Sequence, residues 1–160
     1  MTASPVLPSP VTFRPYTPAD APACLVLFDS NCPPYFHPSE RADFEQFLQD
    51  PEDRGDYWVM ELSGGLVGCG GVWIGAEGQA GLSWGMVRRG VHRQGLGTQL
   101  TVFRLERLRA RPEVRQIRLS TSQHTEAFYA RHGFVAVQRT TDGFAPGLDE
   151  VKMVLELDLR

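Results

Sequence analysis

Residues 87–100, VRRGVHRQGLGTQL, have the composition of a loop that binds phosphate groups. Gly95 and Gly97 remove side chains where a backbone must approach its ligand, so the N–H groups of residues 93–98 can point at an anion. The helix expected after the loop adds partial positive charge at its N-terminus. His92, Arg93 and the two preceding arginines favour a polyanion, although a plain turn in a solvated basic loop has the same composition.

Two well-known phosphate motifs are absent from this segment. A P-loop needs Lys-Ser or Lys-Thr after its glycines, and the dinucleotide fingerprint GxGxxG needs a third glycine, and neither occurs here. A simple nucleoside triphosphate or a nicotinamide dinucleotide is therefore not favoured as the ligand.

A second motif, STSQHTEAFYARHGF at residues 120–134, follows a strand-like run at residues 117–119. In this order and at this separation, the two segments resemble the GNAT superfamily of N-acetyltransferases, which use acetyl-coenzyme A (acetyl-CoA). The first segment is similar to the family's Arg/Gln-x-x-Gly-x-Gly/Ala loop. The second is similar to its short helix that carries a Tyr and closes with Gly-Phe. Strand-like runs around both segments extend the resemblance over most of residues 11–157.

The resemblance implies an α/β fold: one domain with a central mixed, mostly antiparallel sheet flanked by helices, in which the fourth and fifth strands splay apart. The pantetheine arm of acetyl-CoA lies between those strands in the family. Carried over to this sequence, backbone groups of Met86 and Val87 would meet that arm. Main-chain N–H groups would hold the pyrophosphate at Arg93, Gln94, Gly95, Leu96, Gly97 and Thr98. No metal is expected.

Two positions depart from the family pattern. His92 stands where the family usually has Arg or Gln, which leaves the backbone cradle intact because main-chain donors do not depend on side-chain identity. Ser122 falls where many members have an Asn that touches the pantetheine arm. Its hydroxyl either makes that contact or caps the following helix, and Gln123 or His124 could take the contact over.

Tyr129 is the residue that the resemblance assigns to the chemistry. In the family, a Tyr at this place donates a proton to the departing thiolate, and a phenol that keeps its proton at neutral pH suits that role. The alternative is a core aromatic, but Phe128 beside it already supplies one and must point in another direction. Phe134 is assigned to the core.

A base or a water chain must also deprotonate an ammonium acceptor before its nitrogen can attack a thioester. The strand-like residues 80–87 contain no acidic residue, whereas many relatives carry a Glu there. Glu40, Asp29 and Glu150 are candidates by their expected position, and each can also be a plain surface carboxylate. Cys32 has no recognisable His and acid partners, so an acyl-cysteine intermediate is not expected.

The acceptor pocket is expected at Tyr35, Phe36 and Trp84, which could equally be packing residues. The acidic residues 142–150, DGFAPGLDE, are expected to form a loop that attracts a cationic amine or is merely solvated. The leading hypothesis is direct acetyl transfer from acetyl-CoA to a primary amine of a small molecule. The alternatives are acetylation of a protein N-terminus or lysine, or a CoA-binding sensor module without turnover.

Composition limits the class of protein. With 160 residues, 42% of them hydrophobic, the chain can form one domain, expected at residues 11–160 after a flexible segment 1–10. A net charge of −3 and a pI near 5.8 argue against nucleic-acid partners, and no segment resembles a signal peptide or membrane span. Three cysteines without CxxC spacing predict reduced thiols and a cytoplasmic protein. A homodimer is common among similar proteins.

Strands and helices alternate along the chain. Strands are expected at residues 11–14, 57–62, 66–73, 80–87, 117–120, 134–138 and 151–157, with the second and third forming a hairpin. Helices are expected at residues 17–27, 39–48, from 96 onward, and 125–132. In the helix after the glycine loop, Leu96, Leu100 and Phe103 share a core-facing stripe. Arg104, Arg107 and Arg109 of that helix are expected to be solvated.

Overall fold

A computed structural model describes residues 11–90 and 95–157 of the chain. Within them, one seven-stranded mixed sheet has the order β1-β2-β3-β4-β5-β7-β6, flanked by helices, which confirms the predicted α/β architecture. The strands are β1 (Val11–Pro15), β2 (Asp56–Leu62), β3 (Gly65–Ile74), β4 (Gln79–Val87), β5 (Gln116–Thr121), β6 (Val135–Ala145) and β7 (Leu148–Glu156). The helices are α1 (Ala21–Ser30), α2 (Arg41–Gln49), α3 (Pro51–Arg54), α4 (Leu96–Arg109) and α5 (Glu126–Ala130), with 3₁₀ turns η1 (Pro18–Asp20) and η2 (Pro38–Glu40).

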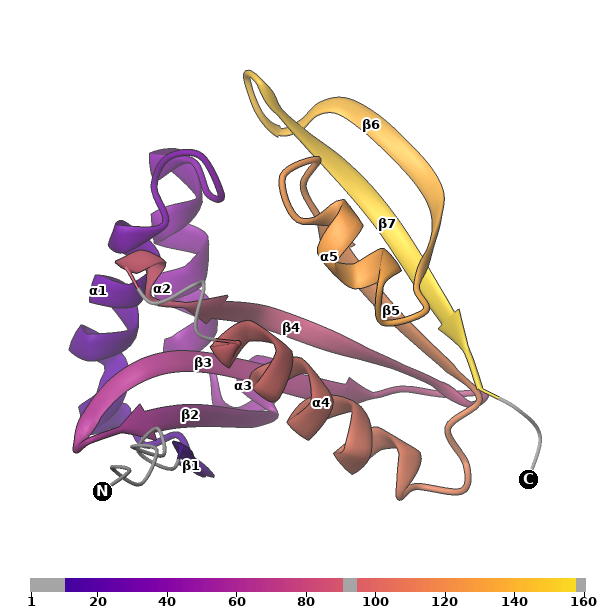
Figure 1. Ribbon diagram of the computed structural model, residues 1–160, viewed down its shortest axis with the longest axis horizontal. Helices are drawn as coiled ribbons and strands as arrows, with labels where there is room; N and C mark the ends of the chain where they lie inside the picture. Colours follow the sequence, from indigo (N-terminus) through magenta and orange to yellow (C-terminus); the bar gives the residue numbers. More distant parts are fainter. Residues whose placement is uncertain (1–10, 91–94, 158–160) are drawn as a thin grey trace, which may run out of the picture.

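The sheet opens between β4 and β5. These strands are parallel neighbours, but they pair only where Gln79–Gly81 meets Gln116–Arg118. Beyond that point they diverge, as Figure 1 shows, so the rest of β4 has no partner strand on that side. The predicted splay is therefore confirmed, and it divides the molecule into a half containing β1–β4 and a half containing β5–β7.

A β-bulge in β4 accompanies the divergence. Cys69 of β3 lies opposite Met86, but Gly71, two residues on, lies opposite Ser83, so β4 has one extra residue over this stretch. Trp84 sits in that stretch with φ 37°, outside the regions that ordinary strand residues occupy. A bulge bends its strand and increases the local twist, which favours separation from β5.

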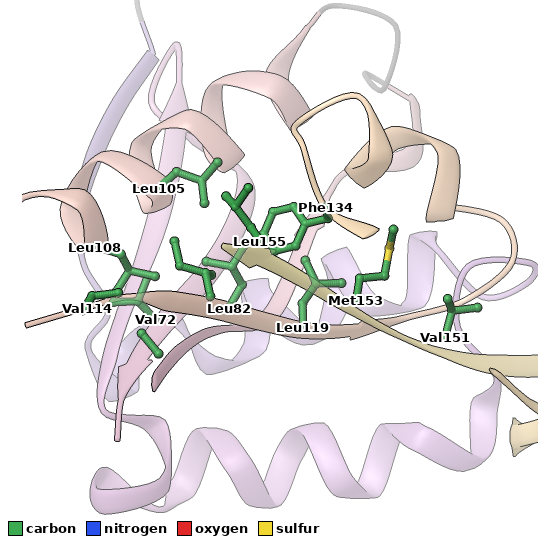
Figure 2. Packing of buried hydrophobic residues seen from close by; sticks show 12 residues of the cluster. Val72, Leu82, Leu105, Leu108, Val114, Leu119, Phe134, Val151, Met153 and Leu155 are labelled. Atoms are coloured by element: carbon green, nitrogen blue, oxygen red, sulfur yellow. The ribbon is translucent and has the colours of Figure 1, made fainter. Parts of the chain in front are cut away.

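Helices cover both faces of the sheet (Figure 1). Helices α1 and α2 pack an aromatic cluster on one face, with Phe28 and Phe44 fully buried. Helix α4 packs on the other face, where Leu96 and Leu100 join the end of β4. Figure 2 shows the third cluster, in which the end of α4 meets β4, β5 and β7 around Phe134, confirming the core position of Phe134.

Two segments differ from the sequence-based expectation. Residues 142–150 were expected to be a loop, but they complete a long β6–β7 hairpin whose strands pair up to Ala145 and Leu148, with a turn at Gly147 (φ 78°). The loop prediction was wrong because Gly and Pro mark a turn without giving its length. The first helix begins as η1, where the Asp20 carboxylate accepts hydrogen bonds from the Thr17 backbone and hydroxyl, and it runs to Ser30.

Among the helices of the described residues, none combines the length and apolar character that crossing a membrane requires.

Candidate active site

A cavity of about 1160 Å³ lies where β4 and β5 diverge, and side chains from both halves of the molecule line it. One end is bounded by the first turns of α4 and by α5. The other end is bounded by η2, α2 and the segment before them. The lining includes Tyr35, Phe36, Glu40, Asp43, Ser83, Trp84, Gly85, Met86, Val87, Gly97, Leu100, Thr101, Arg104, Ser122, His124, Phe128, Tyr129 and Phe144. The cavity therefore connects the expected phosphate loop with the expected acceptor pocket.

The described part of the glycine loop has the backbone geometry of a helix start. Gly95 is the N-cap of α4 and has φ 73°, a left-handed conformation that favours glycine. Gly97 lines the cavity, and a Cβ there would lie 3.6 Å from the Phe128 ring, in space the cavity now uses. The Leu96 side chain is buried in the core, and Thr98 is exposed. The predicted ligands His92, Arg93 and Gln94 lie outside the described residues.

The end of β4 presents backbone groups to the gap. The Arg88 N–H donates to the Val67 carbonyl at 2.8 Å, so Val87 and Gly68 form a non-hydrogen-bonded pair. The Val87 backbone groups therefore face away from β3, and those of its neighbour Met86 face toward it. The Val87 carbonyl accepts a hydrogen bond from the side-chain amide of Asn31 at 3.0 Å. Asn31 is buried, lines the cavity and was not singled out in the sequence.

Ser122 makes the capping-type contact. It is buried at the end of β5, and its hydroxyl accepts a hydrogen bond from the His124 N–H at 3.2 Å. It also lines the cavity, so the structure is compatible with both expected roles. Gln123 is turned to the β6–β7 hairpin, where its side chain bonds the Gly147 carbonyl and the Asp149 N–H, whereas His124 lines the cavity.

Tyr129 lies on α5, half-buried, and lines the cavity. Its ring packs edge-on against Phe128 and Phe134, with centroid separations of 5.1 and 5.9 Å. These contacts hold the ring between the core and the cavity. The geometry therefore gives the tyrosine a fixed position from which its phenol can serve a ligand in the gap.

The three expected acceptor residues all line the other end of the cavity. Trp84 is also a packing residue, because its ring contacts Phe44 at 4.9 Å and Phe36 at 6.0 Å. Tyr35 lies at the rim, edge-on to His124 with 6.3 Å between ring centroids. The bulge places Trp84 here, and its carbonyl accepts a 2.7 Å hydrogen bond from the buried Tyr57 hydroxyl.

Of the three candidate bases, Glu40 is the one that lines the cavity. It is buried at the start of α2, and its carboxylate accepts a hydrogen bond from the His37 N–H at 2.9 Å. Burial raises the pKa of Glu40 above its ordinary value, against a smaller lowering by the His37 hydrogen bond. Asp29 is exposed and paired with Arg41 at 2.9 Å, and neither Asp29 nor Glu150 is among the lining residues.

Burial raises the pKa of the Cys32 thiol to about 11, so this cysteine is a thiol at neutral pH and a poor nucleophile.

In residues 11–90 and 95–157, no three His, Cys, Asp or Glu side chains gather closely enough to share a metal ion.

Arg104 was expected to be solvated, and that prediction was wrong. It is 1% exposed, and it is the largest of the fully buried side chains in the described residues. The signal was present in the sequence, because Leu96, Leu100 and Arg104 follow at intervals of four and therefore share the buried face of the helix. Arg107 and Arg109 of the same helix are exposed, as expected.

Comparison with solved structures identifies the fold. A GNAT-family protein from Desulfovibrio desulfuricans superposes with a TM-score of 0.76 at 23% identity, over 92% of this chain and 99% of that one. The ribosomal-protein-S18-alanine N-acetyltransferase of Escherichia coli gives 0.76 at 18% identity, over 94% and 96%. Rv2747 of Mycobacterium tuberculosis, solved in complex with CoA, gives 0.67 at 20% identity, over 92% and 99%.

A search of curated proteins gave no match. A family model described as "Acetyltransferase (GNAT) domain" matches residues 53–136, which is more than half of the chain and includes β2 to α5. The matched region contains the splayed strands, the glycine loop and the tyrosine-bearing helix. The chain therefore belongs to the GNAT family of acetyl-CoA-dependent N-acetyltransferases.

Proposed function

We propose that this enzyme transfers the acetyl group of acetyl-CoA directly to a primary amine of a small molecule. The observation that carries the proposal is the continuous cavity between β4 and β5. It has the glycine-bearing start of α4 and Tyr129 at one end, and Glu40 with aromatic side chains at the other. A ligand that spans this gap would meet a helix N-terminus, the part of β4 that does not pair with β5, and a phenol in turn.

At the phosphate end, the N–H groups at the start of α4 would hold the pyrophosphate, and His92, Arg93 and Gln94 keep their predicted part in this loop. Gly95, with its left-handed backbone, and Gly97, which has no side chain, fit such a ligand. A side chain at position 97 would narrow the cavity beside Phe128. Val87 would offer backbone groups to the pantetheine arm, with Ser122 on the facing strand.

At the acceptor end, Glu40 takes a proton from the ammonium of the acceptor. The freed amine nitrogen attacks the thioester carbonyl, so a C–N bond forms and the C–S bond breaks with its electron pair passing to sulfur. The nitrogen is positively charged once the C–N bond has formed, and it loses a second proton to solvent as the amide forms. Tyr129 donates its proton to the departing thiolate and regains one from solvent, and Glu40 releases its proton to solvent. No covalent acyl-enzyme is needed, which agrees with the raised pKa of Cys32.

Two features support a small acceptor. One cavity of about 1160 Å³ has to hold both the acetyl-bearing arm and the acceptor, whereas a pocket for a single small ligand is roughly 300–1,000 Å³. Phe144 of the long β6–β7 hairpin is part of the lining. The carboxylates of Glu40 and Asp43, together with the aromatic rings of Phe36 and Trp84, suit an acceptor that carries an ammonium group on an apolar skeleton.

The cytoplasmic location and the homodimer stay predictions.

The proposal is tested by following CoA thiol release from acetyl-CoA with a panel of polyamines, aminoglycosides, amino acids and peptides. We expect release with at least one small amine. Release with peptides alone would support a protein acetyltransferase, which is the activity named for the Escherichia coli protein. Tight acetyl-CoA binding without release across the panel would support a CoA sensor.

A further inference from the structure

The Arg104 side chain packs against β3 and β4 at two positions where these strands carry glycine. A Cβ on Gly70 of β3 would lie 3.2 Å from the guanidinium, and one on Gly85 of β4 would lie 2.4 Å from it. The guanidinium thus fills space on the α4 side of the sheet that both glycines leave open. Its hydrogen bonds are weak, because Nη1 reaches the carbonyls of Gly71 and Ser83 only at 3.4 and 3.5 Å.

The charge on Arg104 is not compensated within the part of the chain that the structure describes. Among residues 11–90 and 95–157, no ion pair involves Arg104, and its Nε atom is buried without a hydrogen-bond partner. The titratable neighbour is Tyr57 of β2, whose pKa burial raises well above its ordinary value, so it is neutral. Glu40 and Asp43 line the same cavity from the α2 side of the sheet. An arginine keeps its charge, so the site holds a buried, unpaired cation.

The position of this cation relates it to the reaction. Arg104 follows Gly95 by nine residues on α4, so it lies roughly 13 Å along the helix from the phosphate end. It lines the cavity beneath Ser83 and Gly85, on either side of the bulge residue Trp84. This is the inner part of the gap, where the strands converge and where the thioester end of an extended ligand would lie.

We propose that Arg104 is a fixed positive charge that stabilises the negative charge formed on the thioester oxygen and then on the CoA sulfur during acetyl transfer. The inference rests on the proposed function of the cavity. The bonds formed and broken are those given above, and Arg104 takes part through its charge, without exchanging a proton. A preformed charge in a site with little water is effective because it needs no reorganisation during the reaction.

The experiment measures the thiol pKa of CoA bound to the full-length protein, from the ultraviolet absorbance of the thiolate during a pH titration. Arg104→Met removes the charge at similar volume, and Arg104→Gln removes it while keeping a hydrogen-bond donor. Arg107→Met, three residues along the same helix but exposed, is the matched control for loss of one positive charge. Melting temperature and CoA affinity are measured for every variant.

The thiol pKa should rise by about one unit in Arg104→Met and Arg104→Gln, and it should stay near the wild-type value in Arg107→Met. Melting temperature in Arg104→Met should be unchanged or higher, because an unpaired buried charge is replaced by an apolar side chain. If Arg104→Met does not fold, Arg104→Gln supplies the neutral arm.

An unchanged thiol pKa in the folded neutral variants would overturn the role of Arg104. A fall in melting temperature with unchanged thiol pKa would assign the side chain to the fold alone, which also overturns it. If the wild-type protein binds no CoA, the proposed function fails instead, so the two failures are distinguishable. With an accepted amine, kcat should fall about 100-fold in Arg104→Met while KM for acetyl-CoA changes little.

Discussion

At the scale of single residues, the cavity separates the proposed proton donor from the proposed proton acceptor. Tyr129 is held by Phe128 and Phe134 at the α5 end, and Glu40 is held by the His37 N–H at the start of α2. The two residues come from segments about 90 positions apart in the chain. Only the splayed sheet gives them a common cavity, with the proposed thioester between them.

Replacing Tyr129 with Phe removes the phenol hydroxyl and keeps the ring that packs on Phe134. We expect turnover to fall about 100-fold, because a general acid typically contributes at least that factor. Dissociation constants for CoA, measured by calorimetry, should stay within about threefold of wild type. The control is Phe128→Tyr, which adds a hydroxyl on the neighbouring ring. Wild-type turnover in Tyr129→Phe would remove the tyrosine from the mechanism.

The raised pKa of Glu40 predicts how kcat/KM and stability depend on pH. A base acts when ionised, so kcat/KM should rise with pH through the raised pKa of Glu40, and Glu40→Gln should lose this rise together with most activity. The effect on stability has the opposite sign. Because the folded pKa exceeds the unfolded one, the folded protein binds the proton more tightly, and stability falls as pH rises between the two values.

Glu40→Gln cannot ionise, and its side-chain oxygen can still accept the His37 hydrogen bond. Its free energy of unfolding should therefore lack that fall with pH, which urea titrations at several pH values can measure. Asp29→Asn, which changes an exposed carboxylate outside the cavity, should keep the wild-type rate profile. A wild-type kcat/KM profile in Glu40→Gln would exclude Glu40 as the base.

At the scale of elements, the start of α4 and the bulge of β4 do most to shape the site. Gly95 begins the helix in a left-handed conformation, and the extra residue in β4 places Trp84 on the acceptor side while Gly85 covers Arg104. Both features are backbone arrangements. Their loss should therefore alter binding even where no ligand-facing side chain changes.

Gly95→Ala tests the helix start. A Cβ at this position meets no heavy atom within 4 Å, so its effect is backbone strain at φ 73°, about 1 kcal/mol. We expect CoA to bind about tenfold more weakly, as for the loss of one hydrogen bond to a charged group. The matched control is Gly64→Ala in the β2–β3 turn, with φ 81° and equally open space.

Both alanine variants should lower the melting temperature by a similar amount, and only Gly95→Ala should weaken CoA binding. Equal CoA affinity in the two variants would argue against a phosphate cradle at the start of α4.

At the scale of the whole molecule, one sheet carries two half-sites. β1–β4 with α1 and α2 supply the acceptor end, and β5–β7 with α5 supply Tyr129 and Ser122. Within the sheet, the two halves are joined by the short pairing of Gln79–Gly81 with Gln116–Arg118. They also share the core cluster on the α4 side of the sheet. A ligand that fills the gap would contact both halves and should stabilise the fold.

Acetyl-CoA should therefore raise the melting temperature. At 100 times its dissociation constant a ligand stabilises the folded state by about 2.7 kcal/mol, which corresponds to a rise of roughly 5–10 °C for a domain of this size. Pantetheine at the same concentration lacks the pyrophosphate and should give a much smaller rise. Differential scanning calorimetry measures both, and an equal rise with the two ligands would place the main binding energy away from α4.

The sequence alone predicted the β2–β3 hairpin, the helix that begins after Gly95, the tyrosine-bearing helix and the core position of Phe134. These features depend on local patterns, since apolar periodicity and turn residues act over a few neighbours. The family resemblance supplied the splay between β4 and β5, which the register confirms. The length of the β6–β7 hairpin was missed because residues 139–143 of the exposed strand β6 are polar or glycine and show no apolar alternation.

The tertiary structure decided what surrounds each charge. In the sequence Glu40 was one of three equal carboxylates, and packing of η2 against the aromatic cluster is what buries it in the cavity. Arg104 was grouped with Arg107 and Arg109, although its spacing from Leu100 was a usable signal. Its burial without an ion-pair partner among the described residues depends on glycines of two strands lying above it, which are 34 and 19 residues away in the chain. Local sequence determines which elements form, but the dielectric around a charge is set by contacts distant in sequence, and these exist only in the folded molecule.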